Sequence, residues 1–387
     1  MLVKRKERLF YLDNIKIFLV ILVILHHVGQ AYGPTGGFWH YRSSIGESIP
    51  TLGRFFAVNA AFFMGFLFLI SGYFFPASYD RSNGKGFVQK RLLRFGVPLL
   101  FVFLIMEPLQ MYFYYTVYSG NAPMPFLQYY IRIWFGIGGM PEDFIDSLGR
   151  FPYLNFAHAW FILHLLVYAI IYWLIRKILK RPVVEQEGKP LLAKHLALIF
   201  IAIAVSVLIV RIWYPIDYWV GVLGFFQVEI AHWPQYIVMF TVGIMAYRKN
   251  WLNTLSVKTG YAALAVGCLL VIGVYSGLIH TLSHYPWAWM IWAIYGSLLA
   301  VSLSFGLLTL FRERFNITNP FLKILSRCSF AAYIIHMPIV LAVQFALDTV
   351  VIGGAVGKFV TVSVISVVLT YGLSALLVRV KLLRSIL

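Results

Sequence analysis

Long apolar stretches alternate with short polar stretches along almost all of the 387 residues. A membrane-spanning helix needs about 20 mainly apolar residues to cross roughly 30 Å of hydrocarbon. We predict spanning helices at residues 15–33, 54–75, 95–118, 157–178, 195–214, 233–247, 259–279, 287–311, 328–348 and 358–380. The sixth is short, and residues 219–229 before it are apolar enough for a re-entrant or interfacial segment. The pattern predicts an all-α, polytopic integral membrane helix bundle of about ten helices in one domain, residues 1–387.

The composition agrees with a chain that is embedded in a lipid bilayer. Hydrophobic residues make up 61% of the sequence and charged residues 12%, and the mean hydropathy is +0.81. Aromatic residues reach 18%, which suits the ring belts that form at the two bilayer surfaces. These values exclude a water-soluble protein.

The charged residues fix the expected topology. The formal net charge of +18 suggests nucleic acid, but the positive charge forms no continuous stripe along one surface. Of the 32 Lys and Arg residues, 26 fall in six short segments: 1–16, 76–94, 176–194, 248–258, 312–327 and 379–387. Basic loops stay in the cytoplasm. We therefore predict that both termini are cytoplasmic, that the 119–156 loop is outside, and that nucleic acid is no partner.

The first predicted helix carries three ionisable residues close to one face. Lys16 and His27 are eleven residues apart, which brings them within about 20° of each other around a helix and separates them by about 16.5 Å along it. Lys16 then lies at the cytoplasmic edge and His27 beyond the middle of the membrane. Asp13 lies about 40° off this face. Ionisable side chains at membrane depth cost about 2.5 to 3.5 kcal/mol each, so this stripe indicates either function or a polar neighbour.

His27 is the candidate catalytic residue of this stripe. An imidazole can take a proton from a hydroxyl near neutral pH, and a cation at the cytoplasmic mouth can hold an anionic donor. The alternative is a polar stripe that only satisfies an adjacent helix. His26 points about 100° away, and we expect it to pack or to form a hydrogen bond.

A basic cluster opens the third predicted helix. Lys90, Arg91 and Arg94 occur there, and the two arginines share a face because they are three residues apart. An ordinary positive-inside anchor is one interpretation, and a binding site for an anion is the other. Glu107 stands inside the same helix before Pro108, and we expect it to pair within the bundle or to line a cavity.

Polar residues also interrupt the ninth predicted helix. Tyr333 and His336 are three residues apart, which predicts a polar face directed inward. Cys268 and Cys328 have no Cys or His at ligand spacing, so neither a disulfide framework nor a metal site is predicted. No role is assigned to the histidines near the predicted outer rim, His40, His232, His280 and His284.

Four short motifs follow one another along the chain. They are residues 11–16 (YLDNIK) with ten residues and then His27, residues 69–74 (LISGYF), residues 90–94 (KRLLR) and residues 333–338 (YIIHMP). In this order they resemble the acyltransferase 3 family, and the resemblance covers roughly residues 11–380. That family's membrane enzymes move acyl groups, commonly acetyl, from cytoplasmic acyl-CoA to glycans or similar acceptors outside.

The resemblance implies roles for particular residues. By matching position, Lys16 and His27 fall on the family's basic residue and histidine, and Arg91 and Arg94 fall on its arginine pair. Lys16 stands where arginine is usual, and lysine lacks the guanidinium fork. Lys16, Arg91 and Arg94 are then expected to bind acyl-CoA, and His27 to act as general base or to carry the acyl group. Possible supporting residues are Asp13, Glu107, Tyr333 and His336.

Two other functions compete with acyl transfer. A transporter or carrier of a glycan or small anionic substrate also needs charges around a midplane cavity, although no inverted repeat relates the two halves of the chain. A catalytically inactive sensory relative would bind acyl-CoA without turnover. We expect an O-acyltransferase of a prokaryotic plasma membrane, with acyl-CoA as donor substrate and no permanently bound cofactor. Without a fused extracytoplasmic domain, it is similar to the stand-alone glucan- and O-antigen-modifying members.

Overall fold

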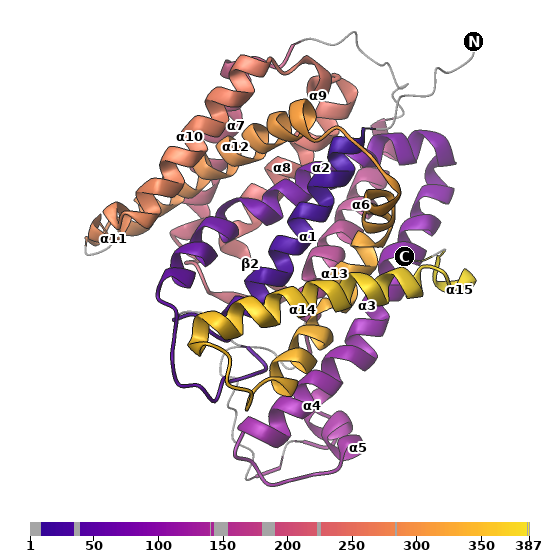
Figure 1. Cartoon of the computed structure of the whole chain (residues 1–387). Helices are drawn as coiled ribbons and strands as arrows, with labels where there is room; N and C mark the ends of the chain where they lie inside the picture. The colour runs from indigo at the N-terminus through magenta and orange to yellow at the C-terminus, as the bar shows by residue number, and fades with distance from the viewer. Residues whose placement is uncertain are drawn as a thin grey trace.

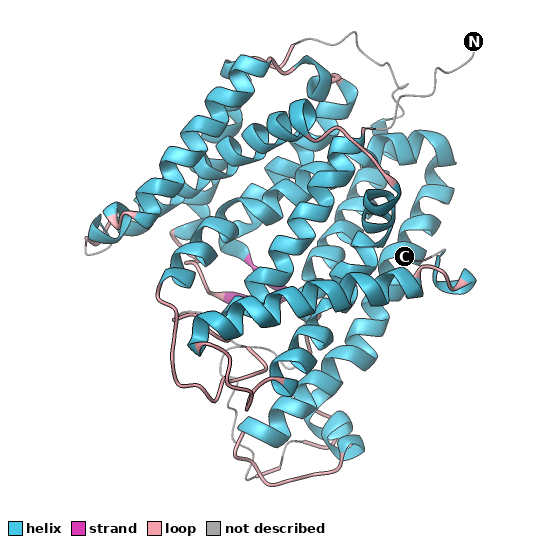
Figure 2. Cartoon of the chain, in the orientation of Figure 1, coloured by secondary structure: helices cyan, strands magenta, loops and turns pink. Residues whose placement is uncertain are grey.

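The computed structural model describes residues 9–34, 39–139, 141–142, 154–179, 190–222, 226–282, 285–384 and 386. Within these residues the apolar stretches are helices, joined by loops and by one pair of short strands (Figures 1 and 2). The longer helices are α1 (Phe10–Gln30), α2 (Thr51–Arg91), α4 (Glu107–Tyr118), α6 (Trp160–Leu179), α7 (Ala193–Arg211), α8 (Trp233–Arg248), α10 (Val257–Tyr275), α12 (Ala288–Arg314), α13 (Pro320–Ala346) and α14 (Gly354–Leu377).

Shorter helical pieces connect or extend these helices. The short α-helices are α3 (Val97–Phe101), α5 (Phe126–Tyr129), α9 (Trp251–Thr254), α11 (Leu278–Leu282) and α15 (Lys381–Arg384). The π-helical turns are η1 (Leu92–Gly96), η2 (Val102–Met106) and η3 (Tyr130–Trp134), and the 3-10 turns are η4 (Ala157–Ala159) and η5 (Ile230–His232).

Nine helical segments of the described chain are long and apolar enough to cross a membrane. They are Phe10–Gln30, Thr51–Ser82, Gly84–Tyr118, Ala157–Leu179, Ala193–Arg211, Val257–Tyr275, Ala288–Arg314, Pro320–Ala346 and Gly354–Leu377. The predicted short sixth helix is α8, which has 16 residues. The prediction of a polytopic all-α bundle is confirmed.

Several helix boundaries differ from the predicted ones because polar residues at the ends are also helical. α1 begins at Phe10 instead of residue 15, so it includes Asp13 and Lys16. α13 begins at Pro320 instead of residue 328, and Oδ1 of Asn319 accepts a hydrogen bond of 2.8 Å from a backbone N–H in its first turn. An Asn cap followed by proline is a favourable helix start. Apolar runs therefore locate the buried part of a helix, whereas caps decide where it begins.

The segment predicted as re-entrant or interfacial is a β-hairpin. Strands β1 (Trp219–Val222) and β2 (Phe226–Glu229) are antiparallel, with Trp219 opposite Glu229. The hairpin lies between α7 and α8, and it pairs backbone groups that a single extended segment would leave without partners.

One end of the bundle collects the start of α1 and α13 and the end of α12 and α14. Nδ2 of Asn14 donates to the carbonyl oxygens of Phe315 and Ile317, at 2.7 and 3.0 Å. Near the end of α14, the Tyr371 hydroxyl donates to the carbonyl oxygen of Ile17 at 3.4 Å. Helices α1 and α14 therefore run in opposite directions, as an even number of spans requires. Residues 1–8 and 387 lie outside the described residues.

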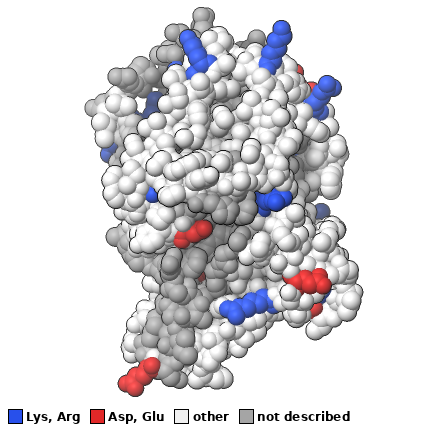
Figure 3. Space-filling view, turned by 90° about the vertical axis from the view of Figure 1, so that its left-hand side faces the viewer, with Lys and Arg blue, Asp and Glu red and all other residues white. Residues whose placement is uncertain are grey.

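The same end carries many of the basic side chains. Figure 3 shows several Lys and Arg side chains projecting from the upper end of one face, whereas lower on that face Lys and Arg side chains occur together with Asp and Glu. We call this the basic end, and its assignment to the cytoplasm remains a prediction from the positive-inside rule.

Helices α2 and α8 touch through two glycines. A Cβ atom on Gly72 would lie 2.2 Å from the carbonyl oxygen of Phe240, and one on Gly243 would lie 2.1 Å from that of Leu69. Both distances are far below a normal van der Waals contact, so the α2–α8 crossing requires glycine at both positions. This contact explains the glycine of the LISGYF motif in physical terms: the motif sets how closely two helices approach.

Candidate active site

The ring of His27 lies between a tryptophan and a second histidine. It stacks on the indole of Trp39, with ring centroids 5.3 Å apart and an interplanar angle of 14°, and its centroid is 5.1 Å from that of His336. The side chain is half-buried, and its Nδ1 is 3.1 Å from Oε1 of Gln30. An amide oxygen only accepts hydrogen bonds, so Nδ1 carries the proton. Nε2 of His27 is thus the unprotonated, basic nitrogen.

Two buried histidines extend this site from other helices. His336 is fully buried, and its Nδ1 donates to the carbonyl oxygen of Tyr333 at 2.8 Å. Its ring centroid is 4.9 Å from that of His158, whose Nε2 donates to the carbonyl oxygen of Ile334 at 2.8 Å. Within the described residues, Nε2 of His336 and Nδ1 of His158 are buried without a hydrogen-bond partner. Each keeps a lone pair that a hydroxyl group can satisfy.

A buried acid lies beside the histidine cluster. Oε1 of Glu107 is 3.3 Å from Nε2 of His40, and its Oε2 accepts a hydrogen bond of 3.2 Å from Nε2 of Gln110. Glu107 is 1% exposed and His40 is 5% exposed, which confirms that Glu107 pairs inside the bundle. His40 directly follows Trp39, its ring lies 5.9 Å from the indole, and the indole stacks on His27. The acid therefore belongs to the surroundings of His27.

The segment that carries Trp39 and His40 is tied to the end of α13. Nε1 of Trp39 donates to Oε1 of Gln344 at 2.9 Å. The Tyr41 hydroxyl and the backbone N–H of Ser44, at 3.1 Å, donate to the Asp348 carboxylate. Burial acts to raise the pKa of Asp348, but the hydrogen bonds from Tyr41 and Ser44 outweigh it and hold the pKa below its usual value. These contacts hold the segment in place against His27.

Lys16 lies towards the basic end of α1. Its Nζ is 2.7 Å from Oδ1 of Asp13, and it lies 5.4 Å from the ring centroid of Phe74. His27 is eleven residues further along the same helix, about 16.5 Å away. The spacing of Lys16 and His27 along α1 is thus as predicted. In addition, Asp13 and the ring of Phe74 contact the Lys16 ammonium.

Arg91 and Arg94 rest on aromatic rings at the same end. The guanidinium of Arg91 lies 4.6 Å from the ring centroid of Phe75, and that of Arg94 lies 5.1 Å from the ring of Phe330 on α13. Among the described residues neither arginine forms an ion pair, whereas Arg248 binds Asp80 through two nitrogens at 2.6 and 3.1 Å. A cation that stacks on a ring without a carboxylate partner remains able to bind a phosphate.

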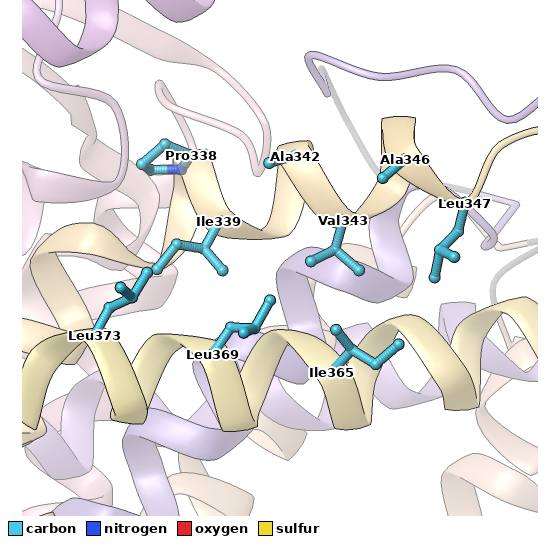
Figure 4. Close-up of a pocket in the computed structure, with 9 residues that line it drawn as sticks. All are labelled: Pro338, Ile339, Ala342, Val343, Ala346, Leu347, Ile365, Leu369 and Leu373. Atoms are coloured by element: carbon cyan, nitrogen blue, oxygen red, sulfur yellow. The ribbon is translucent and has the colours of Figure 1, made fainter.

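One groove of the bundle is lined by apolar side chains. It has a volume of about 480 Å³ between α13 and α14, and it is lined by Pro338, Ile339, Ala342, Val343, Ala346, Leu347, Ile365, Leu369 and Leu373 (Figure 4). None of these side chains can donate or accept a proton. The groove can hold hydrocarbon, but its lining offers no group for acid–base chemistry.

The structure brings some predicted residues together and separates others. His27 and His336 lie side by side, and Tyr333 donates its hydroxyl to the carbonyl oxygen of His158. His26 instead stacks on Phe63, with centroids 5.3 Å apart, which is the packing that its position around the helix predicts. Lys16, Asp13, Arg91 and Arg94 lie at the basic end.

His40 and His158 were not among the candidate residues. His40 comes from an irregular segment between α1 and α2, and His158 comes from the 3-10 turn η4 before α6; both meet the cluster only in the folded chain. The aromatic residue beside each one, Trp39 and Trp160, was the available signal, but outer aromatic residues are usually membrane anchors. Within the described residues, no three His, Cys, Asp or Glu side chains converge as ligands of a metal ion.

Several known proteins are similar to this chain. Glucans biosynthesis protein C from Escherichia coli (strain K12) is 24% identical over 247 residues, which are 62% of this chain and 58% of that protein. Glucans biosynthesis protein C from Shigella dysenteriae serotype 1 gives the same values. The protein of that name from Escherichia coli O17:K52:H18 is 24% identical over 255 residues, 64% of this chain and 60% of the relative. The chain thus spans about three fifths of these relatives, and no solved structure matches it.

The match to a protein family covers nearly the whole chain. Residues 9–379 match the acyltransferase domain family Acyl_transf_3. The chain therefore belongs to this family of acyltransferases.

Proposed function

We propose that this acyltransferase moves an acyl group from cytoplasmic acyl-CoA to a hydroxyl of an extracytoplasmic or lipid-linked glycan. Acetyl is the acyl group that we propose to test first. One arrangement carries the proposal: the ring of His27 lies 5.1 Å from that of His336, which in turn lies 4.9 Å from that of His158, and a basic cluster lies towards the other end of the helix that carries His27. A donor bound at that cluster reaches inward towards His27.

The donor's phosphates bind at the basic end. Arg91 and Arg94 supply guanidinium groups that pair well with phosphate oxygens, and Lys16 adds a point charge without the guanidinium fork. Asp13 holds the Lys16 ammonium at 2.7 Å. The thioester then lies deeper than the nucleotide, since Lys16 and His27 are about 16.5 Å apart along α1.

The chemistry takes place at Nε2 of His27. As a general base, it takes the proton of the acceptor hydroxyl while the oxygen attacks the thioester carbonyl. As an acyl carrier, it attacks the thioester itself, and the C–S bond breaks. Both routes need the tautomer that the hydrogen bond to Gln30 sets. His336, whose Nδ1 donates to the carbonyl oxygen of Tyr333, accepts a hydrogen bond from a neighbouring, non-reacting hydroxyl of the acceptor.

The similar proteins suggest a class of acceptor. Glucans biosynthesis protein C is named for glucans, and we extend this to the present chain as a glucose oligosaccharide acceptor. Such a glycan outside a prokaryotic plasma membrane meets the end of the bundle opposite to the basic end.

Acetyl-CoA binding to the purified protein tests the donor half of the proposal. A ligand at about 100 times its Kd stabilises the folded protein by about 2.7 kcal/mol, so the melting temperature should rise. Mass spectrometry of cell-surface glycans, with and without the protein, then identifies the acceptor. A melting temperature that ignores acetyl-CoA supports the carrier alternative, and binding without any CoA release supports an inactive sensory relative.

A further inference from the structure

A buried carboxylate and a histidine form a hydrogen-bonded pair beside His27. Glu107 is 1% exposed, and its two oxygens contact Nε2 of His40 at 3.3 Å and Nε2 of Gln110 at 3.2 Å. Burying a carboxylate costs several kcal/mol unless its partners compensate. Neither of these contacts comes from Lys or Arg. The buried Glu107 carboxylate therefore lacks the cationic partner that usually offsets the cost of burial, which suggests a functional role.

The hydrogen bond fixes how His40 can react. A carboxylate oxygen accepts, so Nε2 of His40 carries the proton and Nδ1 is the basic nitrogen. A carboxylate on the far side of an imidazole orients the ring and stabilises the imidazolium that forms when the other nitrogen takes a proton. Glu107 and His40 therefore have the arrangement of a general base and its positioning residue.

The pair is linked to His27 through the Trp39 indole. His40 directly follows Trp39, whose indole stacks on His27 at 5.3 Å and lies 5.9 Å from the His40 ring. His27 approaches along α1 from the basic end, whereas His40 enters from the segment beyond the opposite end of α1. The two histidines thus reach the same indole from the two sides of the bundle.

We propose that His40, positioned by Glu107, takes the proton of the acceptor hydroxyl in a second half-reaction, while His27 carries the acyl group. First, Nε2 of His27 attacks the thioester carbonyl, the C–S bond breaks, and CoA leaves as a thiolate. The acceptor oxygen then attacks the acyl carbon, its proton passes to Nδ1 of His40, and the C–N bond to His27 breaks. The proposal rests on the proposed acyl transfer, and it separates the roles of two histidines.

The two half-reactions can be measured separately in the full chain. Purified protein without acceptor reports the first, as a burst of CoA release from acetyl-CoA. Membrane vesicles with their native glycans report the second, as transfer of labelled acetyl. His40→Gln should keep the burst and lose about 10² to 10⁴ of the transfer rate. Glu107→Gln, which keeps an acceptor for His40 but removes the charge, should lower kcat for transfer without changing the KM for acetyl-CoA, and Glu107→Asp should recover part of the rate.

A matched control exists in the same chain. Nε2 of His232 lies 3.5 Å from Oε1 of Glu229, also near the entrance to a helix. His232→Gln and Glu229→Gln should leave both half-reactions unchanged. Acetyl-CoA should still raise the melting temperature of each variant, which shows that the variant is folded.

Three outcomes overturn the inference without touching the proposed function. They are a wild-type protein that transfers acetyl but shows no burst, a His40→Gln protein whose burst and transfer fall equally, and one whose transfer is unchanged. A wild-type protein that neither releases CoA nor transfers acetyl contradicts the proposed function itself.

Discussion

His26 and His27 are neighbours in the sequence with different surroundings. His26 packs among aromatic rings, 4.9 Å from Phe56 and 5.3 Å from Phe63, whereas His27 faces Trp39 and His336. We predict that His27→Ala abolishes acyl transfer while acetyl-CoA still binds. His26→Ala should retain most activity, because it removes packing and no basic nitrogen of the site. Release of CoA by the two variants, normalised to folded protein, measures the difference.

The opposite pattern would refute this assignment. A dispensable His27 together with an essential His26 would mean that the wrong face of α1 had been chosen. The melting temperature of each variant with and without acetyl-CoA separates lost chemistry from lost folding.

Arg94 offers the cleaner test of the donor site. Its side chain is exposed and covers a single described ring, Phe330, whereas Arg91 lies over Phe75, Phe87 and Phe95. Losing a charge-assisted phosphate contact costs about 1.5 to 3 kcal/mol, roughly tenfold to a hundredfold in affinity. Arg94→Ala should weaken acetyl-CoA binding by that factor.

Lys177→Ala provides the comparison for Arg94→Ala. Lys177 also lies over an aromatic ring, Trp173, at 5.3 Å, but it belongs to α6. Its loss should leave acetyl-CoA affinity unchanged. Equal affinity in the Arg94 variant and the wild type, measured by titration calorimetry, would return Arg94 to the role of a membrane anchor.

The sequence predicts those residues of the site that lie at helical spacing within an apolar helix. His27 and Lys16 stand out because charged groups are costly in an apolar helix, and Glu107 for the same reason. His40 and His158 do not, because His40 lies in an irregular segment and His158 in the short 3-10 turn η4, where a polar residue costs nothing until the chain folds. Their approach to His27 depends on tertiary contacts that no local pattern encodes.

At the scale of elements, the α2–α8 crossing depends on glycine. A methyl group on Gly72 would lie 2.2 Å from a backbone oxygen of Phe240, an atom that cannot rotate away. Gly72→Ala should therefore separate the two helices and cost about 1 to 3 kcal/mol, the usual range for an overpacked core. Thermal unfolding of the purified protein measures this loss.

Gly372 on α14 is the control for Gly72. A Cβ there meets nothing within 4 Å, so Gly372→Ala should be neutral or should gain up to about 1 kcal/mol from helix propensity. If the two alanine variants unfold at the same temperature, the close α2–α8 contact does not exist in the protein.

Helix positions were predictable because long apolar runs have few alternatives, but their ends were not. The start of α13 moved to Pro320 because Asn319 caps it, and residues 219–229 became a hairpin because their backbone groups pair with each other. Both outcomes follow from hydrogen bonding, which a hydropathy pattern does not describe.

At the scale of the whole molecule, the topology follows from charge. We predict a cytoplasmic location for the basic end, because 26 of 32 Lys and Arg residues lie in the six segments on that side of the predicted topology. Reporter fusions after residue 387 should be active only as cytoplasmic reporters, and insertions in the 119–156 loop only as external ones. If fusions after residue 387 report the external side, the prediction of an even number of membrane spans is wrong.

In the proposed function, donor and acceptor approach from the two ends of the bundle and meet inside the membrane. The cations that suit phosphate lie at one end, and His40 and the segment that carries it enter from the other. The central claim is therefore transfer of an acyl group across the bilayer, and not movement of an intact substrate.

Inside-out vesicles from cells that make the protein test this claim most directly. Labelled acetyl-CoA, which does not cross the membrane, is added outside the vesicles, and label is then measured in the enclosed glycans and lipid-linked material. The account predicts label on hydroxyl groups of that material with the wild-type protein and none with His27→Ala. Equal labelling by the two proteins, or no labelling by the wild type, would contradict it.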